Sequence, residues 1–157
     1  MKKEASLSIV EDIKNHKFLM IKHLRGVNKG FINFSGGKKE EGESIEDCVK
    51  RETFEETGIT IINPKQVGYV EFYPMNYCVS IFKSTEFTGK IKAKKDEVEV
   101  FWQDADKIPY DKMREADRDY LPEIFAGKYV NKKYTYDENG MVIDTVNLPS
   151  ADNKKSR

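Results

Sequence analysis

The sequence predicts a fold of mixed strands and helices, either α/β or α+β. Three observations predict it: an amphipathic helix over residues 45–57, short β-rich runs on both sides of that helix, and a length of 157 residues, which fits one domain with a real core. No internal repeat or linker divides the sequence. We therefore expect one domain over residues 1–148, followed by a polar tail over residues 149–157.

The N-terminal part is expected to form two short strands, over residues 5–10 and 17–24, with a polar turn between them. A stretch punctuated by glycines follows and ends at the pair Gly36 and Gly37. Glycine allows backbone groups to approach a ligand closely. Taken alone, such a pair is more simply explained as a turn.

The helix expected over residues 45–57 has start and stop signals. Ser44 is well placed as its N-cap, and Asp47 three residues later completes a capping-box pattern. Gly58 stands where a left-handed C-terminal cap belongs.

The remainder of the chain is β-rich, with a second helix near its end. Strands are expected over residues 59–62, 67–73, 77–82, around Trp102, and over 129–136 and 141–146, with a charged loop over 90–96 and a helix over about 117–125. Residues 137–140 read Asp-Glu-Asn-Gly, which favours a hairpin turn. Trp102 lies in an alternating strand and is expected in the core.

Composition limits the function classes. Lysine plus arginine and aspartate plus glutamate both total 27, so the formal net charge is zero, which argues against a protein that coats nucleic acid. Cys48 and Cys78 fit no zinc motif, which favours a reduced protein. No apolar run approaches the roughly 18 residues of a membrane helix, and there is no signal-peptide pattern. We expect a cytoplasmic protein without a membrane partner, either a monomer or a homodimer.

One side of the predicted helix turns from apolar to acidic. Seven residues share that side at helical spacing: Ile45, Cys48, Val49, Glu52, Glu55, Glu56 and Ile59. A glutamate-rich helix is usually a solvated surface, and the other face, which includes Thr57, has that character. Three carboxylates continuing a core-facing stripe repel one another and are costly to bury. Hard divalent cations such as Mg²⁺ bind carboxylate oxygens, so the stripe indicates a metal–phosphate site beside the glycine pair.

Residues 37–59 resemble the Nudix box. The fixed positions are Gly37, then Glu43 after five residues, then after seven more the run Arg51-Glu52-Thr53-Phe54-Glu55-Glu56-Thr57-Gly58-Ile59. Every charged and glycine position of the box is present, and Thr53 departs from the family's usual aliphatic residue. Because so many positions are fixed in spacing, the match is far more specific than a short glycine motif.

The resemblance implies an α+β fold, an α/β/α sandwich with a mixed β-sheet flanked by helices and a loop–helix–loop catalytic motif. It implies that Glu52, Glu55 and Glu56 are catalytic and bind Mg²⁺, for which Mn²⁺ can substitute, together with a backbone carbonyl of the Gly36–Gly37 pair, for which we choose Gly37. Glu43 and Arg51 are expected to support the helix as an ion pair. Many members add a glutamate from outside the box, and Glu97 is the candidate here, although an exposed loop acid is an equal alternative.

Residues 5–148 also resemble the MutT-like branch, which removes oxidised purine nucleoside triphosphates such as 8-oxo-dGTP. In that branch an asparagine at the position of Asn33 contacts the base, although Asn33 as a turn cap is an equal alternative. Some animal members have a Trp-Pro-Asp-Asp stretch that holds the purine, and residues 114–117 read Arg-Glu-Ala-Asp instead. Asp117 is then expected to contact the base, with Phe72 or Tyr120 stacking on it.

Phosphate contacts are expected from His23, Arg25 and Lys38, each of which is equally explained as surface charge. The expected reaction is Mg²⁺-dependent cleavage of a purine nucleoside triphosphate substrate, oxidised ones included, to a monophosphate and pyrophosphate. Two alternatives remain open: hydrolysis of another diphosphate, such as ADP-ribose, a dinucleoside polyphosphate or a capped RNA, and a non-catalytic nucleotide-binding module. A nucleic-acid partner is not expected, because the net charge is zero.

Overall fold

The computed structural model describes residues 2–92 and 96–149. Its strands are β1 (Lys3–Asp12), β2 (Lys17–His23), β3 (Ile32–Asn33), β4 (Ser35–Lys38), β5 (Thr60–Ile62), β6 (Lys65–Tyr73), β7 (Tyr77–Ser84), β8 (Glu86–Thr88), β9 (Val98–Asp104), β10 (Val130–Tyr136) and β11 (Val142–Asn147). Its helices are α1 (Ile45–Thr57), α2 (Glu115–Phe125) and a short 3-10 helix, η1 (Tyr110–Lys112).

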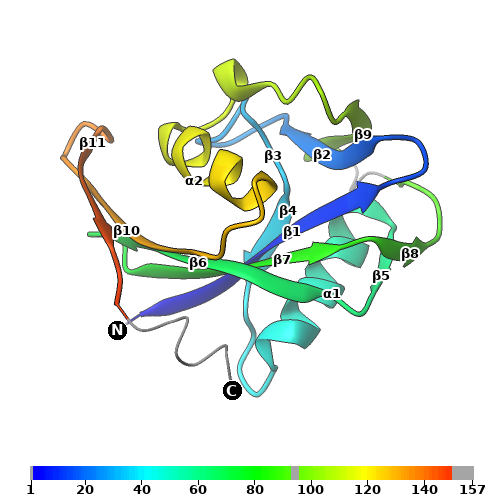
Figure 1. The fold of residues 1–157 in the computed structure, drawn as a ribbon, viewed down its shortest axis with the longest axis horizontal. Helices are drawn as coiled ribbons and strands as arrows, with labels where there is room; N and C mark the ends of the chain where they lie inside the picture. The colour runs from blue at the N-terminus through cyan, green and yellow to red at the C-terminus, as the bar shows by residue number, and fades with distance from the viewer. Residues whose placement is uncertain (1, 93–95, 150–157) are drawn as a thin grey trace.

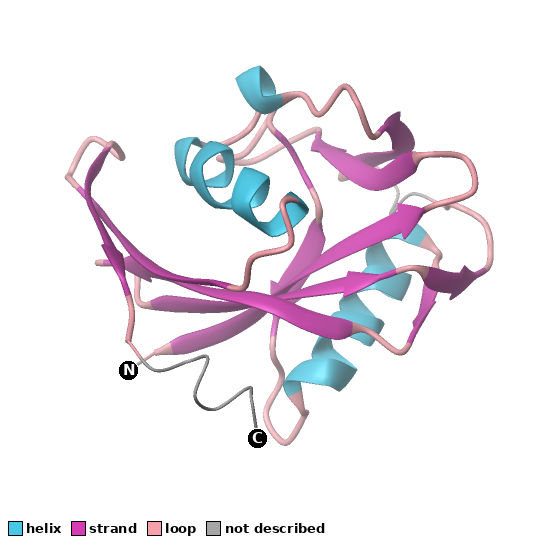
Figure 2. Cartoon of the chain, viewed as in Figure 1, coloured by secondary structure: helices cyan, strands magenta, loops and turns pink. Residues whose placement is uncertain are grey.

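The main sheet has the strand order β11-β10-β6-β7-β1-β2-β3, with β4 joined to β1 and β9 joined to β2. It is mixed, because β1 runs parallel to β7 and β6 parallel to β10, whereas the other neighbours are antiparallel. The two long helices lie on opposite sides of the sheet (Figure 1; Figure 2). The predicted α+β fold with a mixed sheet and flanking helices is therefore confirmed.

Alternation along β1 divides the core in two. Leu7 and Ile9 join the larger cluster, which packs beneath α2, and Val10 joins a smaller cluster beneath α1. Trp102 packs against the smaller cluster, with its ring 5.2 Å from that of Phe87, as expected for a core residue. Both helices are thus fixed on the sheet by apolar burial.

The ends of α1 agree with the sequence. The hydroxyl of Ser44 accepts a hydrogen bond from the Asp47 amide at 3.0 Å. Gly58 adopts a left-handed conformation with φ 84°, and its amide donates to the Phe54 carbonyl at 2.9 Å. These caps fix where the helix begins and ends.

The inward side of α1 differs from the prediction. Thr53 and Thr57 are fully buried, although Thr57 was expected on the solvated face, whereas the Glu55 side chain is 53% exposed. The two threonines can be buried because their hydroxyls donate to the carbonyls of Val49 and Thr53, each at 2.6 Å. The glutamates therefore lie along the edge of the buried stripe rather than continuing it.

Other element boundaries also differ from those predicted. α2 begins at Glu115, two residues before the predicted start, and the glycine-punctuated stretch contains β3 and β4. Strand β8 was not predicted. Residues 93–95 of the expected charged loop and 150–157 of the expected tail lie outside the described residues. Both cysteines are free thiols, and within the described ranges no helix has the length and apolar character needed to span a membrane.

Candidate active site

The glycine pair in β4 brings α1 close to the sheet. A side chain at Gly36 would overlap the backbone carbonyl of Ser6 in β1. A side chain at Gly37 would overlap the carboxylate of Glu52. The pair therefore has two different functions: Gly36 allows the strands to pair, and Gly37 leaves space for an acidic side chain of α1.

Arg51 connects the acidic residues of α1 to the loop before it. Its guanidinium donates to both oxygens of Glu43, Nε to Oε2 at 2.6 Å and Nη2 to Oε1 at 3.0 Å. Its Nη1 lies 3.1 Å from a carboxylate oxygen of Glu52 and of Glu55. Hydrogen bonding from Arg51 lowers the pKa of Glu43 to about 2. Arg51 thus compensates three negative charges at once.

Glu56 is held from the other side. Its Oε1 accepts a hydrogen bond from the Ser35 hydroxyl at 2.8 Å and from the Gly36 amide at 3.2 Å. These two donors fix the carboxylate against β4, although Glu56 is far from β4 in the sequence. Ser35 was not predicted as a site residue, because no local pattern indicates a contact between residues 21 apart.

The carbonyl of Gly37 also has a partner from α1. The buried thiol of Cys48 lies 3.5 Å from this carbonyl oxygen and 3.4 Å from the Ser6 hydroxyl. The three groups join α1, β1 and β4. Desolvation raises the pKa of the Cys48 thiol, so it stays protonated and can donate.

The donor set has the chemistry of a hard-cation site: three carboxylates beside a backbone carbonyl. Among the residues described, however, no three acidic, histidine or cysteine side chains are arranged to hold a metal ion. The contacts explain why, since Arg51 holds Glu52 and Glu55 while Ser35 and Gly36 hold Glu56. The residue types fit a divalent cation, which would have to compete with Arg51 for the first two carboxylates.

The predicted phosphate contacts lie at the end of β4, at the end of β2 and in the loop that follows β2. Lys38 ends β4, and its ammonium lies 5.6 Å from the centre of the Tyr77 ring. Arg25 donates to the Asp96 carbonyl at 2.7 Å. His23 ends β2, where burial and then the charge of Arg114 lower its pKa. His23 is therefore neutral at pH 7 and is a hydrogen-bonding group rather than a cation.

The sequence left two interpretations open for Glu97 and two for Asn33. Glu97 is exposed just before β9, and its backbone carbonyl accepts a hydrogen bond from the Leu24 amide at 2.9 Å. The side-chain oxygen of Asn33 accepts from the Phe34 amide at 2.7 Å, as a local cap does. That contact leaves the side-chain NH₂ of Asn33 available to a ligand.

Asp117 is buried on α2, with a side-chain environment that is unusual for an acid. It is 4% exposed, its Oδ1 accepts from the Tyr120 hydroxyl at 2.6 Å, and its Oδ2 has no hydrogen-bond partner within residues 2–92 and 96–149. Burial raises the pKa of this carboxyl, which favours its neutral form. Tyr120 is 2% exposed, so it is not available to stack on a ligand, as had been considered.

Phe72 remains the aromatic candidate on this side of the sheet. Its ring is stacked on Tyr134 at 5.9 Å and lies 6.0 Å from Tyr136. Phe72 is only partly buried, so part of its surface stays accessible. Burial and, to a smaller extent, the charge of Asp117 raise the pKa of Tyr136, so Asp117 lies near this aromatic group.

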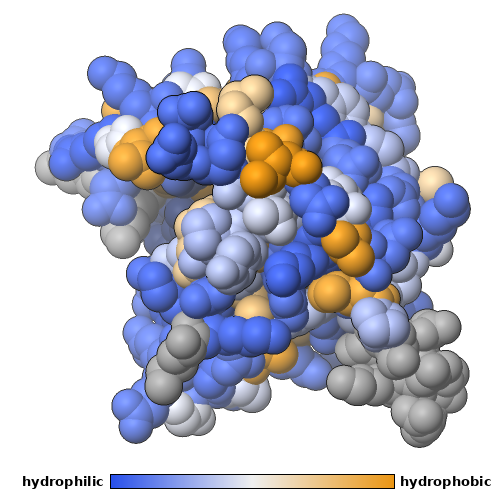
Figure 3. Space-filling view, turned by 90° about the vertical axis from the view of Figure 1, so that its left-hand side faces the viewer, coloured by the Kyte–Doolittle hydropathy of each residue, from blue (hydrophilic) through white to orange (hydrophobic). Residues whose placement is uncertain are grey.

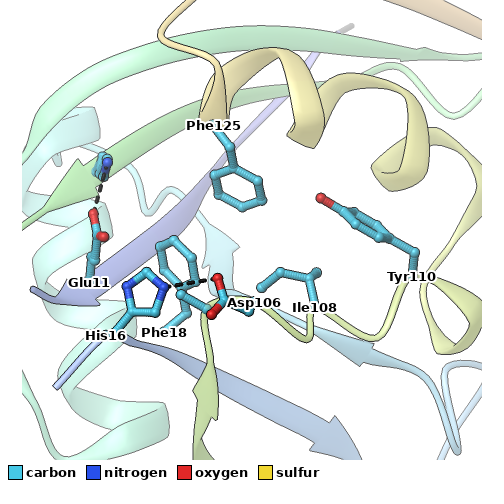
Figure 4. Close-up of a pocket in the computed structure, with 9 residues that line it drawn as sticks. Glu11, His16, Phe18, Asp106, Ile108, Tyr110 and Phe125 are labelled. Carbon is cyan, nitrogen blue, oxygen red and sulfur yellow. Dashed lines mark hydrogen bonds and ion pairs between the residues drawn. The ribbon is translucent and has the colours of Figure 1, made fainter.

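A cavity of about 400 Å³ lies elsewhere (Figure 4). Its lining residues are Glu11, His16, Phe18, Lys83, Ala105, Asp106, Ile108, Tyr110 and Phe125, none of which was predicted as a site residue. Its charged groups are paired with one another, His16 with Asp106 at 3.0 Å and Lys83 with Glu11 at 2.9 Å. Because these charged side chains are paired with one another, the lining of this cavity does not indicate a charged ligand.

The chain is similar to known proteins over most of its length. Residues 1–124 match the sequence profile of the NUDIX domain. The chain is 28% identical over 142 residues to "Oxidized purine nucleoside triphosphate hydrolase" of Danio rerio, covering 88% of this chain and 90% of that protein. It is 32% identical over 108 residues to the Mus musculus protein of the same name, covering 66% and 69%.

A solved structure has the same fold. The crystal structure of a MutT protein from Bacillus halodurans superposes with a TM-score of 0.81 at 25% sequence identity, covering 94% of this chain and 98% of that chain. The sheet and both helices are therefore arranged as in a known relative.

Proposed function

Because the chain belongs to the Nudix family, we propose that it is a Mg²⁺-dependent pyrophosphohydrolase that cleaves a purine nucleoside triphosphate into the monophosphate and pyrophosphate. The observation that carries the proposal is that Glu52 and Glu56 lie against the glycine pair of β4, while Arg51 donates to both Glu52 and Glu55. The names of the Danio rerio and Mus musculus relatives, which are oxidized purine nucleoside triphosphate hydrolases, support a purine triphosphate as the substrate. The proposal includes oxidised purines such as 8-oxo-dGTP.

The three glutamates and the Gly37 carbonyl would hold the cation, with Mn²⁺ as a substitute for Mg²⁺ and Glu97 as a further ligand from outside the helix. The cation would neutralise charge on phosphate oxygens and lower the pKa of a water molecule. Ser35 and the Gly36 amide keep Glu56 in place, and Arg51 keeps Glu52 and Glu55 within reach. Water adds to one phosphorus and the anhydride P–O bond breaks, so no covalent intermediate with the protein is required.

The base would be read by Asn33, Phe72 and Asp117. The protonated form of Asp117, which burial favours, would offer one donor and acceptors, and Oδ2, which has no partner among the described residues, would be satisfied if a base edge approached it. Burial of a polar atom without a partner is costly, so ligand contact would recover that free energy. His23, Arg25 and Lys38 would contact the phosphates.

The test is hydrolysis of a panel of nucleotides with Mg²⁺, carried out in ¹⁸O-labelled water. We expect a monophosphate and pyrophosphate as products, and the labelled product identifies the attacked phosphorus. Glu56→Gln should abolish turnover, whereas Glu46→Gln should not, because Glu46 is exposed in the first turn of the same helix and has no part in the cluster.

Three results would contradict the proposal. Nucleotide binding without turnover under Mg²⁺ and Mn²⁺ would indicate a non-catalytic module. Preferred cleavage of ADP-ribose, a dinucleoside polyphosphate or a capped RNA would replace the substrate class. Full activity of Glu56→Gln would place the chemistry elsewhere.

A further inference from the structure

The loop that joins β2 to β3, residues 24–31, is hydrogen-bonded to itself and to β2. The Gly30 amide donates to the His23 carbonyl at 2.8 Å. The Phe31 amide donates to the Asn28 carbonyl at 2.9 Å. The loop passes the start of α2 (Figure 1). These backbone bonds give the loop a defined shape, but they do not fix its place against α2.

The side chain of Arg114, the residue immediately before α2, joins this loop to the helix. Its Nη2 donates to the Val27 carbonyl at 3.2 Å and to the side-chain oxygen of Asn28 at 2.5 Å. The central carbon of its guanidinium lies 3.8 Å from the centre of the Phe31 ring, where a cation is attracted to the aromatic face. Across the described residues, these are the hydrogen bonds that join the loop to the N-terminal end of α2. One planar side chain thus holds the loop at three points.

Arg114 lies among the residues proposed to bind the nucleotide. Burial lowers the pKa of His23, and the charge of Arg114 lowers it further, so the two side chains are near each other. Asp117 lies in the first turn of α2, less than one turn after Arg114. On the other side, the loop contains Arg25 and leads into β3, which carries Asn33. Arg114 therefore connects the segment that contains Arg25 and Asn33 to the helix that contains Asp117.

The loop carries positive charge that is poorly compensated. Residues 24–31 include Arg25 and Lys29 and no acidic residue. The nearest carboxylate oxygen to Arg25, that of Asp96, is 4.0 Å away, and Arg114 adds a third positive charge. Figure 3 views the side of the molecule on which α2 begins, where the surface is largely hydrophilic. Because like charges repel, an anion beside the loop would stabilise this arrangement. The polyphosphate of a nucleotide has the required charge.

We propose that Arg114 is a positioning residue for nucleotide binding, which holds the β2–β3 loop against α2 so that the loop and Asp117 enclose the same ligand. This inference rests on the proposed function. The loop uses Nη2 and one face of the guanidinium, so Arg114 acts through the loop rather than on the reacting atoms. Without Arg114, part of the binding free energy has to order the loop, so affinity falls. The cleavage step is unchanged, because the carboxylates of α1 stay in place.

The first test is calorimetry with the α,β-methylene analogue of dGTP, which has no cleavable anhydride oxygen between the α and β phosphorus atoms. We expect Arg114→Gln to weaken binding about tenfold in the presence of Mg²⁺. Arg118→Gln is the matched control, because Arg118 is an exposed arginine of the same helix whose side chain has no hydrogen bond or ion pair with another described residue. Its affinity should stay near that of the wild type.

Two further measurements test whether Arg114 acts through the loop. Asn28→Ala should also weaken binding, and the double variant with Arg114→Gln should lose less than the two single losses combined, because the two side chains share one hydrogen bond. Without nucleotide, amide hydrogen exchange at Gly30 and Phe31 should be faster in Arg114→Gln than in the wild type, and unchanged in Arg118→Gln. With dGTP as the substrate, Arg114→Gln should raise KM and leave kcat unchanged.

The outcomes separate this inference from the proposed function. Unchanged exchange at Gly30 and Phe31, additive losses in the double variant, or a lower kcat without a higher KM overturns the role of Arg114, even if the wild type cleaves the nucleotide. A wild type that does not bind the analogue overturns the proposed function and this inference together.

Discussion

The guanidinium of Arg51 donates to both carboxylate oxygens of Glu43, at 2.6 Å and 3.0 Å. Two parallel hydrogen bonds to one carboxylate fix the orientation of the guanidinium. The remaining nitrogen, Nη1, is therefore directed at Glu52 and Glu55. The orientation of the acidic edge of α1 therefore depends on a residue in the loop that precedes it.

The Glu43–Arg51 pair predicts a pH dependence of stability. The pKa of Glu43 is lowered to about 2 in the folded chain, against 4.5 as its ordinary value. A lowered carboxyl pKa stabilises the fold at pH values above 4.5, and that contribution is lost as the pH falls toward about 2. Melting temperatures of the metal-free protein should fall through this range, and Glu43→Gln should lack this part of the decrease. Parallel curves for the two proteins would contradict the assignment.

Removing the Ser35 hydroxyl should weaken cation binding without unfolding the protein. Ser35→Ala removes the 2.8 Å hydrogen bond to Glu56, and loss of such a supporting contact typically costs about 10–100-fold in metal affinity. Mn²⁺ binding measured by calorimetry checks this result. Ser84→Ala is the control, because Ser84 is equally buried and its hydroxyl has no hydrogen-bond partner in the described part of the chain. Equal Mn²⁺ affinity of the two variants would exclude a role for Ser35.

The two glycines of β4 should respond differently to alanine. Gly36→Ala would overlap the Ser6 carbonyl, so we expect a loss of stability of about 1–3 kcal/mol, as for other overpacking changes. Gly37→Ala would instead displace the Glu52 side chain, so Mn²⁺ affinity and turnover should fall while the melting temperature changes less. Thermal unfolding and Mn²⁺ titration of both variants separate these effects. A reversed pattern would show that Gly37, not Gly36, is the structural glycine.

Asp117 should lower the stability of the fold at neutral pH and, in the proposed function, should contribute to ligand binding. Its folded pKa is raised by burial, so the folded chain binds the proton more tightly than the unfolded chain and stability decreases as the pH rises above 3.8. Asp117→Asn removes this penalty, so its melting temperature should exceed that of the wild type at pH 7 and by less at acidic pH. In the proposed function it should also raise KM for the purine nucleotide. A lower melting temperature of Asp117→Asn at pH 7 would contradict a buried carboxyl whose raised pKa destabilises the fold.

The sequence predicted the parts of the fold that depend on neighbouring residues. Ser44 and Gly58 defined α1 because caps act within one helical turn. The burial of Thr57 was missed, because its polarity suggests solvent, while its hydroxyl donates to a carbonyl of the helix itself. The contact between Ser35 and Glu56 was not predictable either, because it exists only after β4 and α1 pack together.

The proposed site divides along the chain in a way that affects how the protein can change. The carboxylate cluster and its supports come from residues 35–56, whereas the buried acid Asp117 comes from the last third of the chain. In the proposed function none of the three base contacts, Asn33, Phe72 and Asp117, lies in residues 35–56, so substitutions at these positions would alter which ligand is accepted without removing the groups that would break the anhydride. Under this proposal, selection would be able to change the recognised base while the carboxylate cluster is inherited intact.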